Sequence, residues 1–188
     1  MTAGYPSDAA DDAVQANVVA AGYGGSSGVA PGSLTPGSAV SLQATTACCT
    51  DQSIRHRNGA AVISVIGGNS SGLDKQDATW VVRRGLAGGT CLSFESVNYP
   101  GEFLRHSYGR LYLQTADGSS LFHADATFCP HPGANGKGSS FSSSNYPGSY
   151  VRHYNGNVYI ASDGGPDPWD STSSWQDDVS WAVGPGWS

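Results

Sequence analysis

An internal repeat constrains what this chain can fold into. Residues 93–113 (SFESVNYPGEFLRHSYGRLYL) return at 140–160 (SFSSSNYPGSYVRHYNGNVYI), and 11 of the 21 aligned positions are identical. A fainter third copy at 53–59 keeps only the Arg-His core. Self-similarity at a fixed period indicates that one structural unit is built several times. The sequence therefore predicts three copies of a unit of about fifty residues.

The same acidic and aromatic signature follows each Arg-His pair. Because equivalent aromatic residues can share one core, their repetition needs no function to explain it. A shared core gives no such reason for a repeated His and a repeated Asp, so these are the candidate functional residues. The three signatures are Asp77-Ala78-Thr79-Trp80, Asp125-Ala126-Thr127-Phe128 and Asp178-Val179-Ser180-Trp181, and the corresponding histidines are His56, His106 and His153.

Composition and turn residues indicate an all-β chain. Charged residues make up only 13% of the sequence, whereas long surface helices usually carry many Glu and Lys. Asn58-Gly59 and Asn155-Gly156 are two-residue hairpin signals, and Tyr108-Gly109 stands at the same place in the middle copy. We expect strands near 40–44, 53–57, 61–66, 79–83, 91–96, 103–107, 111–114, 127, 140–143, 150–154, 158–161 and 179–183, with no helix between them.

Four strands in each of three units predict a β-trefoil over residues 38–188. A propeller is the competing repeat fold, but three blades fall below its usual minimum of four. In the trefoil the second strands point Ile54, Leu104 and Val151 into the core beside the repeated aromatic residues.

The beginning of the chain differs from the rest. Residues 1–23 match nothing in the repeat, and residues 24–37, rich in Gly, Ser and Pro, are typical of a flexible linker. We therefore interpret 1–23 as the end of an absent domain. The first residues lack the basic head and apolar middle of a signal peptide.

The cysteines favour an oxidising compartment. Cys91 and Cys129 bracket the second repeat and are expected to form a disulfide. Cys48 and Cys49 are adjacent, and either a bond between neighbours or two free thiols is compatible with the sequence.

Charge and spacing disfavour several kinds of partner. The formal net charge is −6 and no basic block occurs, so we expect neither nucleic acid nor an anionic membrane as a partner. No apolar run approaches the roughly 18 residues of a membrane span. We expect no cofactor and no metal site, because His123, His131 and the nearby Asp117 or Asp125 offer no ligand pair at a usual spacing.

The repeated polar residues are suited to a sugar pocket. A carboxylate accepts hydrogen bonds from two hydroxyl groups, an imidazole bonds a third oxygen, and a nearby tyrosine covers the C–H face of the ring. Tyr108 and Tyr154 are the tyrosines nearest to the histidines of their copies. The arginines Arg55, Arg105 and Arg152 face the other side of each strand, and we expect them to bind carbonyls or the acid of a neighbouring repeat.

Several motifs carry a resemblance to a known family. Residues 38–188 resemble a family 42 carbohydrate-binding module, an arabinofuranose-binding β-trefoil. Residues 1–23 resemble the end of the β-sandwich catalytic domain of a family 54 α-L-arabinofuranosidase, to which that module is normally fused. The motifs are Ala-Thr-Thr-Ala-Cys-Cys-Thr at 44–50, Phe-Glu-Ser at 94–96, Leu-Arg-His-Ser at 104–107, Ala-Asp-Ala-Thr-Phe-Cys-Pro at 124–130 and Arg-His-Tyr-Asn-Gly at 152–156.

The resemblance implies a secreted, monomeric, non-catalytic module. It implies binding to L-arabinofuranose side chains of arabinoxylan or arabinan, and it also implies the Cys91–Cys129 disulfide. The implied pockets contain His106 with Asp125 and His153 with Asp178, and from position alone we add Tyr108, Tyr154, Asn155 and Glu95.

The first repeat offers a candidate third sugar site at His56 and Asp77. It lacks the Asn-Tyr-Pro-Gly turn of the other two copies, and a glycosylation sequon at Asn69 precedes the aspartate. A glycan on Asn69 would be able to obstruct that pocket.

The alternative is the α-L-arabinofuranosidase activity itself. Retaining glycosidases need two carboxyl groups about 5–5.5 Å apart. Each repeat supplies a single repeated aspartate, and the family's catalytic carboxylates belong to the domain that is almost wholly absent here. We therefore expect this chain not to cleave glycosides. A ricin-type lectin is disfavoured because no Gln-x-Trp triplet occurs. A structural trefoil of the protease-inhibitor type would leave the repeated polar residues unused.

Overall fold

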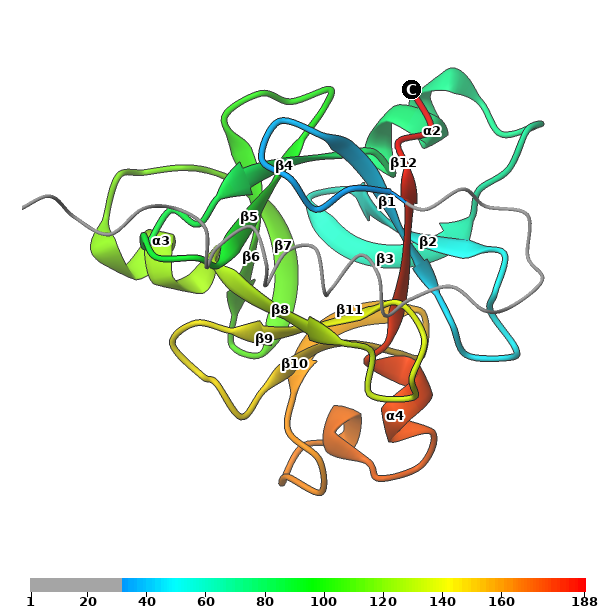
Figure 1. Cartoon of the computed structure of the whole chain (residues 1–188), viewed down its shortest axis with the longest axis vertical. Coiled ribbons are helices and arrows are strands. Elements are labelled where there is room, and N and C mark those ends of the chain that lie inside the picture. The colour runs from blue at the N-terminus through cyan, green and yellow to red at the C-terminus, as the bar shows by residue number, and fades with distance from the viewer. Residues whose placement is uncertain (1–31) are drawn as a thin grey trace, which may run out of the picture.

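The computed structural model describes residues 32–188, so the expectations for 1–23 and for most of the linker lie outside the described residues. Twelve strands follow one another close to the ranges expected from the sequence, in three lobes around a common centre (Figure 1). The strands are β1 (Ala39–Ala44), β2 (Gln52–Arg57), β3 (Ala60–Val65), β4 (Trp80–Arg84), β5 (Leu92–Ser96), β6 (Glu102–Ser107), β7 (Arg110–Thr115), β8 (Phe128–Pro132), β9 (Ser139–Ser143), β10 (Tyr150–Tyr154), β11 (Asn157–Ala161) and β12 (Trp181–Pro185).

Six of these strands form a closed antiparallel ring. In order around the ring, β1 pairs with β4, β4 with β5, β5 with β8, β8 with β9, β9 with β12, and β12 with β1. Closure leaves these strands without a free sheet edge, which in an open sheet would expose unpaired backbone groups.

The other six strands form three hairpins, β2–β3, β6–β7 and β10–β11. The hairpins contact one another through the pairs Ala60 with Tyr112, Arg110 with Tyr159, and Val62 with Asn157. Their turns are Asn58-Gly59, Tyr108-Gly109 and Asn155-Gly156, and both residues of each turn have positive φ. This is the geometry that favours Asn-Gly in two-residue hairpins.

The core confirms the predicted equivalence of the repeats. Trp80, Phe128 and Trp181 are fully buried, and the second strand of each repeat buries Ile54, Leu104 or Val151. Two of the equivalent contacts match in detail. The indole Nε1 of Trp80 donates to the carbonyl of Ile54 over 3.1 Å, and Nε1 of Trp181 donates to the carbonyl of Val151 over 3.0 Å.

The expectation of no helix was wrong. Short helices α2 (Gly72–Asp77), α3 (Ser120–Asp125) and α4 (Trp175–Asp178) precede the last strand of each repeat, and the third repeat also contains a 3-10 turn, η1 (Pro168–Asp170). Ser71 and Ser119 cap α2 and α3 by accepting backbone N–H groups. Helices of four to six residues are too short for the 3.6-residue period to become visible in a sequence.

The four cysteines form two disulfides. The predicted Cys91–Cys129 bond is confirmed, with 4.3 Å between the Cα atoms, and Cys48 is bonded to its neighbour Cys49. Of the two possibilities that the sequence left open for the adjacent cysteines, a bond between them or two free thiols, the structure has the bond.

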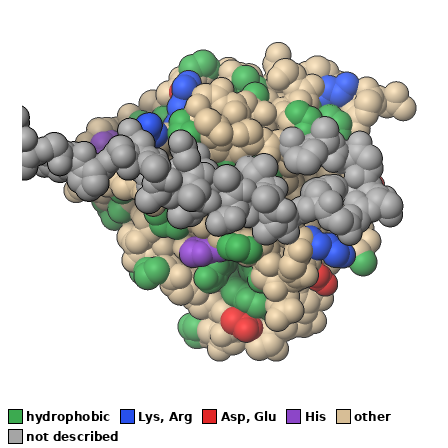
Figure 2. All heavy atoms as spheres, in the orientation of Figure 1, with side chains coloured by type: hydrophobic (Ala, Val, Ile, Leu, Met, Phe, Trp, Pro, Cys, Tyr) green, Lys and Arg blue, Asp and Glu red, His purple; other side chains and the backbone are tan. Residues whose placement is uncertain are grey.

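On the face drawn in Figure 2, the described Lys and Arg side chains lie in small groups near the margins and form no single patch. Within residues 32–188 no helix is long and apolar enough to cross a membrane.

Candidate functional site

The structure brings the predicted His and Asp together in all three repeats. The distance from Nε2 of the histidine to Oδ1 of the aspartate is 3.3 Å for His56 and Asp77, 3.4 Å for His106 and Asp125, and 3.5 Å for His153 and Asp178. Each histidine lies on the first strand of a hairpin, and each aspartate is the last residue of the short helix that follows. The fold therefore brings together, at three equivalent places, a histidine and an aspartate that are about twenty residues apart in the sequence.

An arginine from the same strand fixes each aspartate. The guanidinium nitrogen of Arg55, Arg105 or Arg152 lies 2.6, 2.5 or 2.8 Å from Oδ2 of the aspartate of its own repeat. Each arginine therefore binds the aspartate of its own repeat. We had expected the acid of a neighbouring repeat, so that expectation was wrong. Arg152 also donates to the carbonyls of Trp169, Ser171 and Ser173, which agrees with the expected role in binding carbonyls.

The first two sites are completed by the repeat that follows. Asn98 Nδ2 donates to Asp77 Oδ1 over 2.7 Å, and His56 Nε2 lies 3.0 Å from Asn98 Oδ1. Asn145 makes the same two contacts with Asp125 and His106, at 2.8 and 2.9 Å. The Asn-Tyr-Pro-Gly turn of one repeat therefore lies against the His-Asp pair of the repeat before it.

The tyrosine of each turn lies beside the same histidine. The ring of Tyr99 meets His56 edge-on with 5.3 Å between centroids, and Tyr146 meets His106 in the same way at 5.4 Å. One of our two reasons for doubting the first repeat was its missing turn, but that repeat uses the turn of the second. The site at His56 and Asp77 consequently has the same set of side chains as the site at His106 and Asp125.

The third site differs because its completing residue is Thr46. Thr46 Oγ1 donates to Asp178 Oδ1 over 2.9 Å and lies 2.8 Å from His153 Nε2. The strand pairings show that these residues are equivalent. Gln43, Glu95 and Ser142 each pair with the first strand of the hairpin in their own repeat. The residues three positions later are Thr46, Asn98 and Asn145. From the sequence we did not predict these three residues, or Tyr99 and Tyr146, as site residues. The repeated Asn-Tyr pair was the sequence feature that could have identified the asparagines and the tyrosines.

The hydrogen bonds place the ring proton of each histidine on Nε2. Asn98 and Asn145 present their oxygen to the ring because their amide nitrogen donates to the aspartate, and Thr46 donates its hydroxyl proton to Asp178. Burial lowers the pKa of His106, although the bond to Asn145 and the charge of Asp125 act in the opposite direction. Burial likewise lowers the pKa of His153. These two imidazoles are therefore neutral near pH 7.

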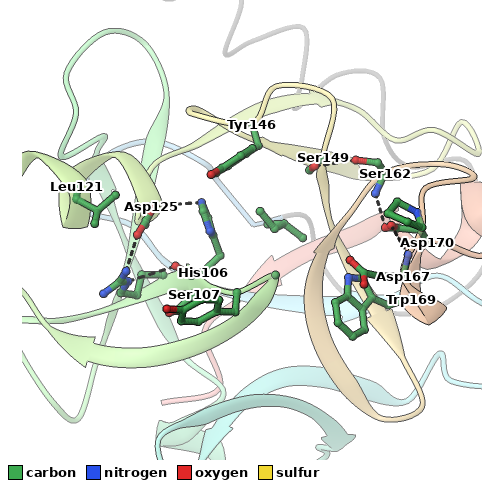
Figure 3. A pocket seen from close by; sticks show the side chains of 15 residues that line it. His106, Ser107, Leu121, Asp125, Tyr146, Ser149, Ser162, Asp167, Trp169 and Asp170 are labelled. Atoms are coloured by element: carbon green, nitrogen blue, oxygen red, sulfur yellow. Dashed lines mark hydrogen bonds and ion pairs between the residues drawn. The ribbon is translucent and has the colours of Figure 1, made fainter.

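The second site lies at one end of a cleft of about 540 Å³. The side chains of His106 and Asp125 are only 5% and 6% exposed, yet both line this cleft together with Tyr146 (Figure 3). Tyr108 is fully exposed at the hairpin turn and lines the same cleft.

The other residues that we added from position alone have different surroundings. Tyr154 lies beneath the guanidinium of Arg152, with 5.7 Å from its centroid to Cζ, and Asn155 occupies the exposed turn after β10. Glu95 accepts a hydrogen bond from the backbone of Gly101 over 2.7 Å and pairs with Arg83, so it holds the Asn-Tyr-Pro-Gly turn in place. In residues 32–188 no group of three or more His, Cys, Asp or Glu residues has the arrangement of a metal site.

The chain is similar to known proteins over its whole length. The model of the α-L-arabinofuranosidase B (ABFB) domain matches residues 42–183, and that of the α-L-arabinofuranosidase B catalytic domain matches residues 1–24. A probable α-L-arabinofuranosidase B of Aspergillus clavatus is 48% identical over all of this chain, which covers 37% of that protein. An α-L-arabinofuranosidase of Hypocrea jecorina is also 48% identical, with 38% of its length covered. The chain thus spans a little over a third of the length of these relatives.

Solved structures give the same result. A crystal structure of an arabinofuranosidase complexed with arabinofuranosyl-α-1,2-xylobiose superposes with a TM-score of 0.81 at 43% identity, over 99% of this chain and 39% of the other. A structure described as a BEL β-trefoil superposes with a TM-score of 0.54 at 15% identity, over 80% of this chain and 94% of the other, and this likeness concerns the fold alone. Because the domain model covers most of the sequence, the chain belongs to the α-L-arabinofuranosidase B (ABFB) domain family.

Proposed function

We propose that this chain is a non-catalytic carbohydrate-binding module of the family 42 type. It binds L-arabinofuranose side chains of arabinoxylan or arabinan and directs an α-L-arabinofuranosidase to plant cell-wall polysaccharide. The observation that carries the proposal is the convergence of a histidine and an aspartate at three equivalent places. Its relatives bear the name of an enzyme that acts on arabinofuranosides.

The fold that fits this role is a β-trefoil. The closed ring of six strands, the three hairpins in mutual contact and the likeness to a solved β-trefoil support that assignment. Residues 1–23 are, in this proposal, the end of the catalytic domain, and 24–37 are the linker to the module. In this proposal the module is a secreted monomer, and its two disulfides support the secreted location.

The chemistry of each site suits a small polyol. The aspartate pairs with its arginine through Oδ2, and its oxygens retain lone pairs that accept hydrogen bonds from adjacent hydroxyl groups. The imidazole carries a proton on Nε2, and at His106 and His153, where burial lowers the pKa, Nδ1 is left as an acceptor for a further hydroxyl. Tyr99 and Tyr146 are about half exposed beside the first two sites, where their rings can cover the C–H face of a sugar.

All three repeats bind in this proposal, including the first. The first site has the complete set that the second has, namely Arg55, His56, Asp77, Asn98 and Tyr99. Asn69 of the sequon is exposed before the beginning of α2, and Asp77 ends that helix. Six helical residues span about 9 Å, so a glycan on Asn69 would lie at the far end of the helix from the site.

The carboxylates support binding rather than hydrolysis. A glycosidase acid must hold a proton at working pH, which requires a raised pKa. In the first repeat Asp74 and Asp77 share Arg55, but a hydrogen bond from Ser71 and the contact with Arg55 lower the pKa of Asp74. The other two sites pair one aspartate with one arginine. The alternative function, α-L-arabinofuranosidase activity, then belongs to the full-length protein that includes the catalytic domain.

Affinity electrophoresis tests the proposal. The purified chain is run through gels that contain arabinoxylan, branched arabinan, debranched arabinan or unsubstituted xylan. We expect retardation by arabinoxylan and branched arabinan only, and retardation in unsubstituted xylan alone would contradict the proposal. In a parallel assay with p-nitrophenyl α-L-arabinofuranoside, release of nitrophenol by the chain would contradict its non-catalytic character.

A further inference from the structure

The cleft at the second site extends well beyond the His-Asp pair. One end is formed by Arg105, His106, Asp125 and Tyr146, whereas the other end is formed by Ser162, Pro166, Asp167 and Trp169 (Figure 3). Its volume is about 540 Å³, and its lining continues from the His-Asp pair to the segment that carries Asp167 and Trp169. The proposed function uses only the His-Asp end and leaves the other end without a role.

The far wall of the cleft exists only in the third repeat. The hairpin is joined to the following helix by residues 66–71 in the first repeat and 116–119 in the second, but by 162–174 in the third. This longer segment contains η1 and carries Asp167 and Trp169. The second site therefore faces a wall that the other two sites do not have in the same form.

The segment 162–174 is held in place by buried polar groups. Arg152, which is 1% exposed, donates to the carbonyls of Trp169, Ser171 and Ser173. Asp170, which is 4% exposed, accepts the backbone N–H groups of Ser162 and Asp167. A wall fixed in this way can position a ligand at small entropic cost.

Two aromatic residues, Trp169 at the far end and Tyr108 at the hairpin turn, line the cleft. Trp169 stacks on Tyr159 with 4.5 Å between ring centroids and an angle of 6°, and it contacts the backbone at Gly109, where an added Cβ would lie 3.1 Å from the indole. Tyr108 is fully exposed with φ of 49° at a turn position that Asn58 and Asn155 hold in the other repeats. Asn tolerates this conformation far better than Tyr, so an aromatic residue here is unfavourable for folding. Folding therefore does not explain why Tyr108 occupies this position.

We infer that the cleft is an extended site that binds two or more sugar units. The His106–Asp125 end takes the arabinofuranose, as in the proposed function on which this inference rests. The Trp169–Asp167 end takes the adjoining sugar of the polysaccharide main chain, with Tyr108 and Trp169 against its C–H faces and the Asp167 carboxylate accepting a hydroxyl. The second site is thereby specific for arabinose attached to a chain, and the first and third sites are specific for arabinose alone.

Calorimetric titration of a variant with a single active site tests this inference. His56→Ala and His153→Ala silence the first and third sites and leave the cleft residues unchanged. The two probes are methyl α-L-arabinofuranoside and arabinofuranosyl-α-1,2-xylobiose. We expect the trisaccharide to bind about fivefold to tenfold more tightly, the size of gain that one or two added aromatic and hydrogen-bond contacts give. Adding Trp169→Ala or Asp167→Ala should reduce this ratio below about twofold while the affinity for the methyl arabinofuranoside stays the same.

Asp163→Ala is the matched control, because Asp163 is exposed in the same segment and does not line the cleft. It should leave the ratio unchanged. Equal affinities for the two probes, or a ratio that survives both Trp169→Ala and Asp167→Ala, would overturn the inference while the proposed function stands. Failure of both probes to bind would overturn the proposed function as well. If Trp169→Ala lowers the melting temperature, Asp167→Ala at the surface still decides the question.

Discussion

Asn145 and Asp125 belong to different repeats, yet Nδ2 of the asparagine donates to Oδ1 of the aspartate over 2.8 Å. Asn98 and Asp77 have the same relationship over 2.7 Å. Each of these two aspartates is thus oriented by its own arginine on one side and by the next repeat's asparagine on the other.

Asn145→Ala should weaken binding at the second site and leave the third site unchanged. The substitution removes one hydrogen bond to the aspartate and one to the imidazole, so each of these buried groups loses one of its partners, while Arg105 still binds Asp125 and Ser143 Oγ still lies 3.2 Å from His106 Nε2. We expect a loss of about tenfold in arabinoside affinity. Titrations of variants that retain only His106 or only His153 provide the measurement, and Asp163→Ala, at an exposed residue outside the site, is the control. A loss confined to the third site would contradict the shared arrangement.

Thr46→Val should impair the third site, and Thr46→Ser should restore it. Valine keeps the shape of threonine but removes the hydroxyl that joins Asp178 to His153, whereas serine retains that hydroxyl. The unfolding free energy of Thr46→Val should fall by about 1–3 kcal/mol, since two buried polar groups lose a partner. Urea denaturation and titration with an arabinoside, in a chain that lacks the other two histidines, test both effects. Equal behaviour of the valine and serine variants would show that the hydroxyl has no role.

Stability should decrease when the pH falls below about 6.5. Burial places the pKa of His106 and His153 in the folded protein below the value of about 6.5 that histidine has in an unfolded chain. The unfolded state then binds more protons, so the contribution of these groups is complete above pH 6.5 and is lost as the pH falls through the folded pKa. Urea denaturation at a series of pH values measures the slope, and His106→Gln should reduce it. A folded-state pKa above 6.5 in an NMR titration of His106 would disprove this expectation.

The two disulfides should differ greatly in their effect on stability. The Cys91–Cys129 bond joins residues 38 apart, so its loss restores about 3–4 kcal/mol of chain entropy to the unfolded state. The Cys48–Cys49 bond closes almost no loop, and Cys48→Ala with Cys49→Ala should change the free energy of unfolding by less than about 1 kcal/mol. Thermal and chemical denaturation of the two double variants make the comparison. Similar losses for both pairs would contradict a loop-closure origin.

Retention on arabinoxylan should depend on several sites at once. His106→Ala should reduce retention partially, and adding Asp178→Ala should remove most of it, because sites on one rigid body act together through effective concentration. Affinity electrophoresis of the single and double variants gives the measurement, with circular dichroism as the control for folding. Unchanged retention of the double variant would place the binding site elsewhere.

The positions of the strands could be predicted from the sequence because the repeat and its turns mark them. Asn58-Gly59 and Asn155-Gly156 require positive φ, and Trp80, Phe128 and Trp181 mark equivalent buried positions. The short helices could not be predicted, because six residues capped by a serine look like a polar loop. Their position matters, since each places an aspartate at its end.

The site could be predicted only in part for a related reason. The His-Asp pairs come from one repeat and could be found by comparing its copies. The partners Asn98, Asn145 and Thr46 come from the following repeat, and only strand pairing in three dimensions shows which histidine they meet. Thr46 also differs in type from the other two, so a search for the repeated Asn-Tyr pair does not find it.

The bond from Thr46 to Asp178 has a consequence for the chain as a unit. Because the residue that completes the last pocket lies just after the first strand, removal of one repeat damages two pockets, the one that contains its histidine and the one that it completes for the repeat before it. An isolated repeat would hold no complete pocket at all. Each pocket thus depends on the next repeat, and the last pocket depends on the first repeat. All three pockets are complete only when the beginning and the end of the domain lie together.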